Sequence, residues 1–386
     1  MKAVILAGGE GARLAPLTNV RPKPMLSVAN KPILEHVIEA VKTAGINEIV
    51  LVVGYKRQRI QNYFGDGDDW GVDLEYVVQD TQLGSGHALL QAEPIIGTDL
   101  VVLNGDQIVD SAAITAVVQA RQDTTNAVMA VSQSAETHLY GVVDATDGAV
   151  TDLIEKPIPA EVDSKLINAG VYAFGPEIFS VLRATDSDGE LGLPAALSGY
   201  LDDHPVQAVQ YEGEWFDISR PWDLLTANGT LLDATNVDRD QVTIDDSATT
   251  LEDAHIGVDT RIQPNATILR GTSLGDNVTI GAGAVVENAI VMDDATIGAN
   301  TTIRDCIVGA NATLGPGTVI EGGRADVLLG DTLHRDVRFG GIVGDNATVG
   351  AAVAITPGTR LGNDATVESQ CALDGWYDPN ATVRRG

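Results

Sequence analysis

A glycine-rich stretch near the N-terminus combines the groups that bind a phosphate. The run LAGGEGARLAPLTNVRPKP, residues 6–24, follows the strand-like hydrophobic run of residues 2–6. Backbone N–H groups of a glycine-rich turn after a strand can bind an anion. Arg13 follows the glycines closely enough to reach the same anion, and Lys23 lies between two prolines that restrict its backbone. The stretch is neither a Walker loop nor a dinucleotide fingerprint. Structural glycines and surface cations are the alternative, but in a chain with only seven lysines we favour a phosphate site.

Acid and amide side chains further along the chain have the chemistry to complete such a site. Asp106 follows the apolar run Leu100–Leu103, so it is predicted at the carboxyl end of a buried strand, where open α/β sheets bind ligands. A carboxylate there suits a hard cation such as Mg²⁺, although an isolated Asp is more often a cap or turn residue. Gln79 offers both a hydrogen-bond donor and an acceptor, and Gly84 leaves room beside it. His87 lies in GSGHALL, which is typical of a helix start, so we expect it to be structural.

The composition indicates a soluble, salt-adapted protein. Hydrophobic residues make up 44% of the 386 residues and charged residues 20%, as in ordinary globular chains. The 54 acidic residues outnumber the 24 basic ones, which gives a net charge of −30, and no lysine follows Lys165. Such an acidic surface predicts a protein from a high-salt cytoplasm, as in a halophilic archaeon, where salt screens the repulsion. The same charge excludes nucleic acid as a partner, because no basic face can be assembled.

The location and the cysteines give simpler expectations. No apolar run approaches the roughly 18 residues of a membrane helix, so no membrane partner is expected. The N-terminus begins with a strand-like pattern instead of a signal sequence, which predicts a cytoplasmic protein. Cys306 and Cys371 form no metal-ligand spacing and are expected to be buried bystanders.

Residues 1–235 show the alternating pattern of an α/β domain. Continuous apolar runs predict strands buried on both faces, and they lie at Ala3–Leu6, Ile49–Val53, Leu74–Val78 and Leu100–Leu103. Residues 31–45 carry an apolar stripe at helical spacing and end at a glycine. Helical patterns also follow the second and fourth runs. This order predicts a doubly wound, Rossmann-like mixed sheet.

From about residue 250 the hydrophobic period changes to six. One aliphatic residue recurs at every sixth position from Ile256 to Val286, and the series resumes from Val291, from Val308 and from Val343 to Leu373. A six-residue repeat with turn residues between the aliphatic positions is the signature of a β-helix. We therefore predict a linker at 236–250 and a β-helix at 251–386. Residues 321–341 break the period and are expected to leave the coils as a loop.

Several motifs in the first 230 residues resemble the sugar-1-phosphate nucleotidyltransferase family, which joins a nucleoside triphosphate to a sugar phosphate and releases pyrophosphate. The stretch LAGGEGARLAPLTNVRPKPM resembles the family signature, with Ala12 where the family usually has Thr. VVQDTQLGSGHAL resembles the segment that reads the pyrimidine base, and LNGD at 103–106 resembles the metal site. YGVV, EKP and NAG, at 140–143, 155–157 and 168–170, resemble the sugar pocket. WFDISRPWDLLTAN at 215–228 resembles the segment with the second metal carboxylate.

The resemblance implies a role for each matching residue. It implies catalytic cations at Arg13 and Lys23, Mg²⁺ ligands at Asp106 and Asp217, sugar contacts at Gly141, Glu155 and Asn168, and nucleotide contacts at Leu6, Ala7, Gly8, Gly9, Gly11, Gln79, Gly84 and Ser85. The implied substrates are a pyrimidine nucleoside triphosphate, UTP or dTTP, and glucose-1-phosphate or N-acetylglucosamine-1-phosphate. A regulator that has lost catalysis is the alternative, but Lys23, Asp106 and Asp217 are all intact.

The repeat region resembles the left-handed β-helix of bifunctional uridyltransferase–acetyltransferases. In that family the β-helix forms a trimer and acetylates an amino sugar with a histidine. The matching positions here are Ala299 and, for a nearby lysine, Thr296, and neither side chain can accept a proton. His334, in the segment 321–341 that breaks the period, is the one histidine that an acetyltransferase site could use instead. We therefore expect a trimerisation scaffold or regulatory domain, with an active acetyltransferase as the alternative.

Overall fold

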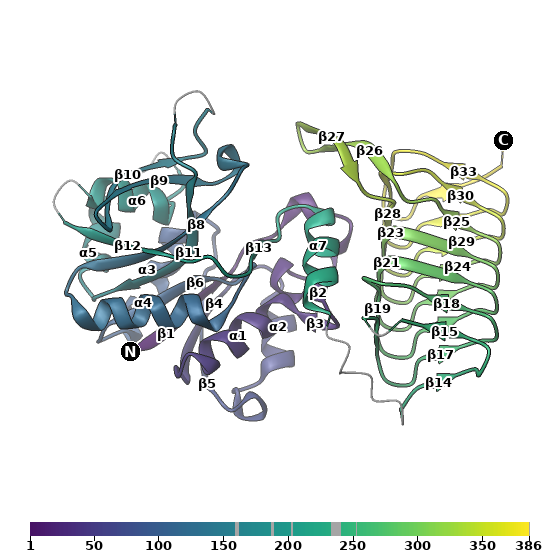
Figure 1. Cartoon of the computed structure of the whole chain (residues 1–386), viewed down its shortest axis with the longest axis horizontal. Coiled ribbons are helices and arrows are strands. Elements are labelled where there is room, and N and C mark those ends of the chain that lie inside the picture. Colours follow the sequence, from purple (N-terminus) through teal and green to yellow (C-terminus); the bar gives the residue numbers. More distant parts are fainter. Residues whose placement is uncertain (159–161, 187–188, 202–203, 233–240, 252, 386) are drawn as a thin grey trace. The chain divides into compact units, whose positions relative to one another are not determined.

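The computed structural model describes residues 1–158, 162–186, 189–201, 204–232, 241–251 and 253–385. The chain divides into two compact units. The sheet unit comprises Met1–Glu10 and Ile33–Asp217, and the coil unit comprises Gly11–Pro32 and Ile218–Gly386. Figure 1 labels the elements of both units along the chain. The segment Gly11–Pro32, called the strap below, therefore packs with the coils, although its sequence lies inside the predicted domain 1–235.

The sheet unit is built on one nine-stranded mixed sheet, as the apolar runs predict. Its strand order is β5-β4-β1-β6-β11-β8-β12-β10-β9. The first four are parallel neighbours, whereas β11 runs antiparallel to both β6 and β8. The bounds are β1 Lys2–Ala7, β4 Glu48–Val53, β5 Asp73–Val78, β6 Leu100–Asn104, β8 Ala127–Gln133, β9 Gly141–Thr146, β10 Ala149–Glu155, β11 Leu166–Phe174 and β12 Val206–Gln210.

Helices cover this sheet on both faces. On one face, apolar residues of α3, α5 and α6 form a core cluster with strand residues such as Val4 and Val102. Alternate residues of each strand point to this face. The buried residues of α1 and α4 lie outside this cluster, and the two helices contact each other and other strand residues. The bounds are α1 Ile33–Thr43, α2 Arg57–Phe64, α3 Ser85–Gln91, α4 Ser111–Asp123, α5 Ile178–Ala184 and α6 Leu193–Tyr200. A doubly wound Rossmann-like domain is thereby confirmed.

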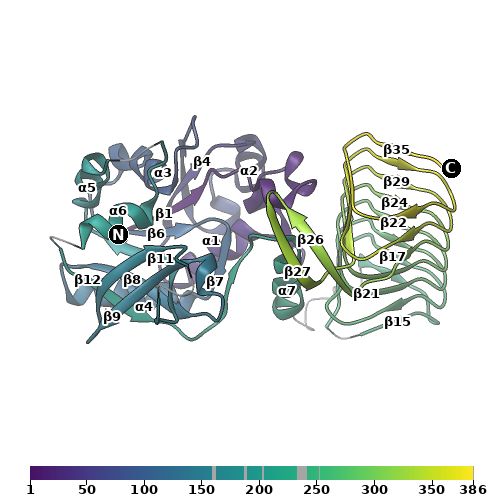
Figure 2. The same cartoon turned by 90° about the horizontal axis from the view of Figure 1, so that it is seen from above.

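The coil unit is a parallel β-helix of hexapeptide repeats, consistent with the left-handed form. Each coil places short strands on strands of the next coil, for example β17 (Arg261–Ile262) on β20 (Thr279–Ile280). Figure 2 shows the stacked strands from above. The aliphatic residues of the six-residue period all belong to one buried cluster, which also contains Cys306 and Cys371. Both thiols are free and buried, as expected. Asn and Asp with positive φ, such as Asn265 and Asp294, form many of the turns, because they tolerate this conformation better than other side chains.

The first coil begins earlier than the sequence period indicates. β14 (Thr243–Ile244) pairs in parallel with β17, and β15 (Thr249–Thr250) pairs with β18 (Thr267–Ile268). Both strands lie in the range 236–250 that we interpreted as a linker, of which residues 236–240 are outside the described residues. The six-residue pattern is weak in this range because the aliphatic residue of β14, Ile244, is only partly buried.

The period break at 321–341 holds regular structure. β26 (Arg324–Leu329) and β27 (Thr332–Arg338) form an antiparallel hairpin, which Figure 2 shows extending from the coils. The sequence predicted only a loop, because the hairpin shares no period with the coils. Buried Asp305 ties its base to the coils by accepting hydrogen bonds from Arg338 Nε at 3.0 Å and Gly323 N at 3.1 Å. The ring of His334 contacts that of Trp222 in α7 (Pro221–Leu231) edge-on, with centroids 5.2 Å apart.

Candidate functional site

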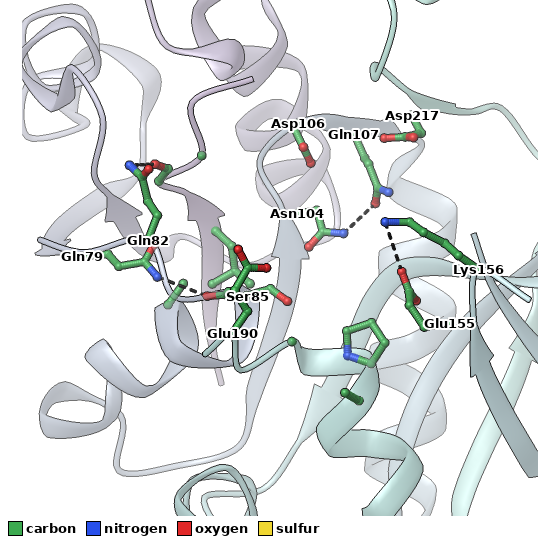
Figure 3. A pocket seen from close by; sticks show the side chains of 18 residues that line it. Gln79, Gln82, Ser85, Asn104, Asp106, Gln107, Glu155, Lys156, Glu190 and Asp217 are labelled. Atoms are coloured by element: carbon green, nitrogen blue, oxygen red, sulfur yellow. Dashed lines mark hydrogen bonds and ion pairs between the residues drawn. The ribbon is translucent and has the colours of Figure 1, made fainter. Parts of the chain in front are cut away.

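A cavity of about 650 Å³ opens at the carboxyl ends of β1 and β6, entirely within the sheet unit. This is the edge at which parallel α/β sheets bind ligands. Figure 3 shows side chains from several loops directed into it. Nine residues predicted for the site line this cavity: Leu6, Gly8, Gly9, Gln79, Gly84, Ser85, Asp106, Glu155 and Asp217. The cavity thus brings together residues that are more than 200 positions apart in the sequence.

Strand pairing places the two predicted metal ligands together. Asp106 lies between β6 and β7 (Gln107–Val109), and Asp217 ends β13 (Trp215–Asp217). β13 pairs antiparallel with β7, and the register sets Asp217 opposite Gln107, the residue that follows Asp106. Figure 3 shows both carboxylates on the same side of the cavity. Two carboxylates with room for substrate oxygens form the donor set that Mg²⁺ uses when it binds through substrate phosphates.

The glycine-rich turn and Gln79 form the opposite wall. A Cβ on Gly8 would lie 2.8 Å from Gln79 Oε1, so this position admits only glycine while the amide keeps its place. Gln79 is 4% exposed, and its Nε2 donates to Gly84 O at 3.1 Å and to His87 Nδ1 at 3.0 Å. His87 therefore holds the amide, in line with the structural role expected of it. Ser85 begins α3, and its Oγ accepts a hydrogen bond from Leu193 N at 2.9 Å.

The predicted sugar residues lie close together, but only Glu155 lines the cavity. Gly141 pairs with Glu155 across β9 and β10, and a Cβ on Gly141 would lie 2.9 Å from the Glu155 carboxylate. Asn168 is 9% exposed; its Nδ2 donates to Tyr172 Oη at 2.5 Å, and its Oδ1 accepts from Gly170 N at 3.0 Å. Burial raises the pKa of Tyr172, so its hydroxyl stays protonated. Asn168 thus holds the irregular middle of β11, and its sugar contact stays a prediction.

Besides Gly141 and Asn168, four more predicted residues lie outside the cavity lining. Ala7 is a buried residue of β1. Gly11, Arg13 and Lys23 belong to the strap. Gly11 has φ of +69°, and a Cβ there would lie 2.7 Å from Lys23 Cβ, so glycine allows Lys23 to pack on this turn. Lys23 is only 7% exposed, which is unusual for a lysine. The catalytic roles of Arg13 and Lys23 stay predictions.

The cavity contains polar residues that the sequence analysis missed. Gln82, Asn104, Gln107, Lys156 and Glu190 all line it. Lys156 was overlooked although it is the middle residue of the EKP motif, and its positive φ of 45° marks it as a special position. Its Nζ lies 3.7 Å from Glu155 Oε1 (Figure 3). A lysine beside a sugar-pocket glutamate, in a chain with few lysines, was a usable signal.

The lining has a strongly acidic charge balance. Among the described residues that line the cavity, Lys156 is the only cation, against four carboxylates: Asp106, Glu155, Glu190 and Asp217. Anionic ligands are repelled by such a lining unless other cations neutralise it. Among the residues that the structure describes, no three or more His, Cys, Asp or Glu side chains form a group that could hold a metal ion. Asp106 and Asp217 would supply two carboxylates to a divalent cation held here, and substrate and water would supply the other ligands, as for Mg²⁺.

Comparisons with known families cover nearly the whole chain. Residues 2–234 match the family model described as Nucleotidyl transferase. Residues 239–338 match the GMPPB C-terminal domain, and residues 342–374 match the Hexapeptide repeat of succinyl-transferase. Among the described helices, none has the length and apolar character to span a bilayer.

Similar proteins extend over one or both units. The Bifunctional protein GlmU of Methanococcus maripaludis is 31% identical, over 97% of this chain and 95% of its own length. The Low-salt glycan biosynthesis nucleotidyltransferase Agl11 of Haloferax volcanii is 34% identical, over 74% of this chain and 89% of its own length. A solved structure of a putative glucose-1-phosphate thymidylyltransferase from Bacillus anthracis, 28% identical, superposes with a TM-score of 0.56 over 60% of this chain and 94% of that one.

Proposed function

The chain belongs to the nucleotidyl transferase family and is a sugar-1-phosphate nucleotidyltransferase, and we propose that it joins a pyrimidine nucleoside triphosphate to glucose-1-phosphate or N-acetylglucosamine-1-phosphate. The observation that carries the proposal is the convergence of Asp106, Asp217 and the glycine turn on one cavity. The glucose-1-phosphate thymidylyltransferase of Streptomyces antibioticus, 32% identical over 76% of this chain and 87% of its own length, supports the pyrimidine and the hexose phosphate.

The reaction is an in-line displacement at the α-phosphorus. A phosphate oxygen of the sugar-1-phosphate forms the new bond to this phosphorus. The bond between the α-phosphorus and the oxygen that bridges to the β-phosphorus breaks, and pyrophosphate leaves with the electron pair. The nucleophile is already ionised, so no general base is needed. Because both substrates are anions, positioning and charge neutralisation are the main contributions of the protein.

The acidic lining requires added positive charge, and we propose that Asp106 and Asp217 hold Mg²⁺. The bound cation would supply charge neutralisation at the phosphate oxygens. Arg13 and Lys23 would neutralise the charge of the reacting phosphorus and the leaving pyrophosphate. Lys156, whose ammonium lies beside Glu155, would bind the phosphate of the sugar substrate. Glu155 would accept hydrogen bonds from sugar hydroxyls.

The base is assigned to the wall formed by Gln79, Gly84 and Ser85. Nε2 of Gln79 is already bonded to Gly84 O and His87 Nδ1, which fixes the plane of the amide. Because both N–H groups of Nε2 are in use, the donor expected from the sequence is not available to a base. The fixed Oε1 would accept a hydrogen bond from N3–H of uracil or thymine with little loss of entropy. Uracil and thymine differ by one methyl group, which is worth only about 1–3 kcal/mol in a pocket. We therefore propose that the enzyme accepts both UTP and dTTP with a modest preference.

The substrate proposal is tested with a matrix of nucleotides and sugars. UTP, dTTP, CTP, ATP and GTP are each combined with glucose-1-phosphate and N-acetylglucosamine-1-phosphate in the presence of Mg²⁺. Pyrophosphate release and nucleotide-sugar formation are both measured. We expect turnover with UTP and dTTP at least about tenfold above the purine nucleotides, as wrong hydrogen-bonding edges leave buried groups unpaired. Equal turnover with ATP would refute the role of Gln79.

For the β-helix we propose a trimeric scaffold in a cytoplasmic enzyme, without acetyl transfer. Ala299 and Thr296 offer no proton acceptor, and half-buried His334 packs edge-on against Trp222. The bifunctional name of the Methanococcus maripaludis GlmU, which matches over 97% of this chain, favours the alternative of an acetyltransferase. Acetyl-CoA with glucosamine-1-phosphate should release no free CoA above background. Release that disappears in His334→Ala would establish the second activity.

A further inference from the structure

The strap, residues 11–32, is fastened to the β-helix through buried polar contacts. It carries both Arg13 and Lys23, and it connects directly to the glycine turn that lines the cavity. We propose that the β-helix positions the strap for nucleotidyl transfer, with Arg21, Asp345 and Asn363 as positioning residues. This inference rests on the proposed function of Arg13 and Lys23.

The first contact joins the strap backbone to a turn of the coils. Asn363 Nδ2 donates a hydrogen bond to Pro16 O at 3.0 Å, while Asn363 Oδ1 accepts from Asp345 N at 2.9 Å. Asn363 is 3% exposed, so a loss of either partner leaves a buried polar group unsatisfied. Pro16 lies three residues after Arg13. The amide therefore fixes the strap close to the first proposed catalytic cation.

The second contact is a buried ion pair. The Arg21 guanidinium donates to the Asp345 carboxylate and contacts the sulfur of Met292. The side chains of Arg21 and Asp345 are only 13% and 8% exposed. The other oxygen of Asp345 accepts from Ala310 N at 3.1 Å, so the carboxylate is held by the coils before it meets the strap. Arg21 lies two residues before Lys23.

The turn column beside Arg21 differs from its neighbours in a way that fits this role. The column runs through Asp276, Asp293, Ala310, Asp345 and Asn363 in successive coils. Backbone N–H groups donate to the side-chain oxygen one coil further on, from Asp276 to Asp293, from Ala310 to Asp345 and from Asp345 to Asn363. From Asp276 to Asn363, Ala310 is the one position of the column without a polar side chain. Arg21 contacts the coils on either side of it, at Met292 and Asp345. Because Ala310 is small, the Arg21 guanidinium of the strap can occupy the space beside it.

A third set of contacts holds the end of the strap. Asn228 of α7 is fully buried; its Oδ1 accepts from Ala29 N at 2.9 Å and from Ser273 Oγ at 2.8 Å. Asn30 Nδ2 lies 2.7 Å from His255 Nδ1 in the first strands of the coils. Lys23 thus lies between two fastened points, Arg21 and Ala29. A cation that is held at both flanks loses little entropy when it engages a phosphate.

The test uses near-isosteric substitutions that remove one strap contact each. Asn363→Asp keeps the oxygen that accepts from Asp345 N but replaces the donor to Pro16 O. Asp345→Asn keeps the acceptor for Ala310 N but removes the charge that pairs with Arg21. Each variant should lower kcat about tenfold and change KM less than about twofold, because a displacement of about 1 Å costs up to about 10² in rate. In the Arg21→Gln/Asp345→Asn double variant, kcat should fall no further than in the worse single variant.

Asp305→Asn is the matched control. Asp305 is also a buried carboxylate of the coils with an arginine partner, Arg338, but it fastens the hairpin instead of the strap. It should lower the melting temperature and leave kcat unchanged. Arg21→Lys, which keeps the charge, should retain a higher kcat than Arg21→Gln. Hydrogen exchange of residues 11–32 should accelerate in the strap variants and not in Asp305→Asn.

The outcomes separate this inference from the proposed function. All kinetics are run well below the melting temperature of each variant, so that folded enzyme is compared. If the wild-type enzyme makes a nucleotide sugar and the strap variants keep its kcat, the positioning role is wrong although the function stands. If Asp305→Asn lowers kcat as much as Asp345→Asn, the effect reflects general destabilisation and the inference is overturned. If the wild type itself forms no nucleotide sugar, the proposed function fails.

Discussion

The two ends of the glycine-rich stretch are used in different ways. Residues 6–10 belong to the sheet unit, where Leu6, Gly8 and Gly9 line a solvent-accessible cavity. Residues 11–32 belong to the coil unit, where polar residues bury their side chains against the β-helix. One end is open toward ligands, whereas the other is fixed by internal contacts. A continuous motif in the sequence thus supplies both a binding wall and a positioned segment.

The two ends also differ in the reason for their glycines. A Cβ on Gly9 would meet no atom within 4 Å, whereas a Cβ on Gly11 would collide with Lys23. Gly11 also has a positive φ that other residues adopt only at a cost. Gly9 thus borders open space at the cavity, whereas Gly11, like Gly8 beside Gln79, leaves space for a neighbouring side chain.

The largest effect is expected on the cavity side, at the paired carboxylates. Asp106→Asn and Asp217→Asn should each abolish detectable turnover at physiological Mg²⁺, because each removes one of the two negative charges proposed to hold the cation. Circular dichroism should show an unchanged fold. A variant that keeps its activity with an unchanged Mg²⁺ requirement would place the metal elsewhere.

On the strap side, Lys23→Ala should lower kcat by about 10²–10³, as for the loss of one preorganised charge stabiliser. Steady-state kinetics of the folded variant measure this effect. Lys165→Ala removes a lysine for which we assign no role, and it serves as the control with kcat near the wild-type value. A Lys23→Ala enzyme with near-normal turnover would remove the catalytic importance of the strap.

A smaller effect is expected for Lys156 in the cavity. Lys156→Ala should raise KM for the sugar-1-phosphate about tenfold or more and change KM for the nucleotide much less, as expected for a lost ground-state contact. Because Lys156 is paired with Glu155, Lys156→Met leaves that carboxylate equally unpartnered and should behave like the alanine variant. An equal rise in both KM values would contradict the assignment to the sugar phosphate.

The two glycines should differ in folding stability. Gly11→Ala should lower the free energy of unfolding by about 1–2 kcal/mol or more, because alanine resists positive φ and its Cβ displaces Lys23. Gly9→Ala should be neutral or slightly stabilising. Urea denaturation of both variants measures the difference. Equal stabilities would mean that the Gly11 turn carries no special constraint.

The smallest effect concerns pH and the coil unit. Burial lowers the pKa of His255, and Lys31 lowers it further, while Asp276 opposes the shift. The unfolded chain therefore binds more protons at this residue than the folded protein, so stability should fall as the pH drops below about 6.5. Protonation also removes the Nδ1 acceptor that faces Asn30.

The melting temperature should depend less on pH, between 7.5 and 5.5, in His255→Gln than in the wild type. Substitution of exposed His138 by Gln should leave the wild-type slope, and the same slope in both variants would contradict the assignment.

The sequence predicted the strands and the coils for clear physical reasons, and family motifs added half of the residues that line the cavity. Aliphatic runs and the six-residue period mark buried positions directly, so both architectures could be predicted from local patterns. The family motifs predict Asp106 and Asp217 in one site, and the β7–β13 pairing brings the two residues close together. Long-range polar contacts could not be predicted. Nothing in the local sequence pairs Arg21 with Asp345, which lies more than 300 residues away.

The missed cavity residues have a similar explanation. Glu190 and Gln107 are polar residues in ordinary loop and strand contexts, and only the fold brings them to the cavity. Asn168 shows the opposite case. Its motif predicts a sugar contact, but in the structure its amide forms hydrogen bonds with Gly170 and Tyr172. The hairpin at 324–338 was missed because the six-residue period stops before it begins.

The central claim is that the cavity joins a pyrimidine nucleotide to a sugar phosphate. The most direct measurement is pyrophosphate release by the purified wild-type protein with Mg²⁺ and UTP or dTTP, with and without a hexose-1-phosphate. The account predicts release only when both substrates are present, with one nucleotide sugar formed per pyrophosphate. Release without the sugar phosphate, or no release with any hexose-1-phosphate, would contradict it.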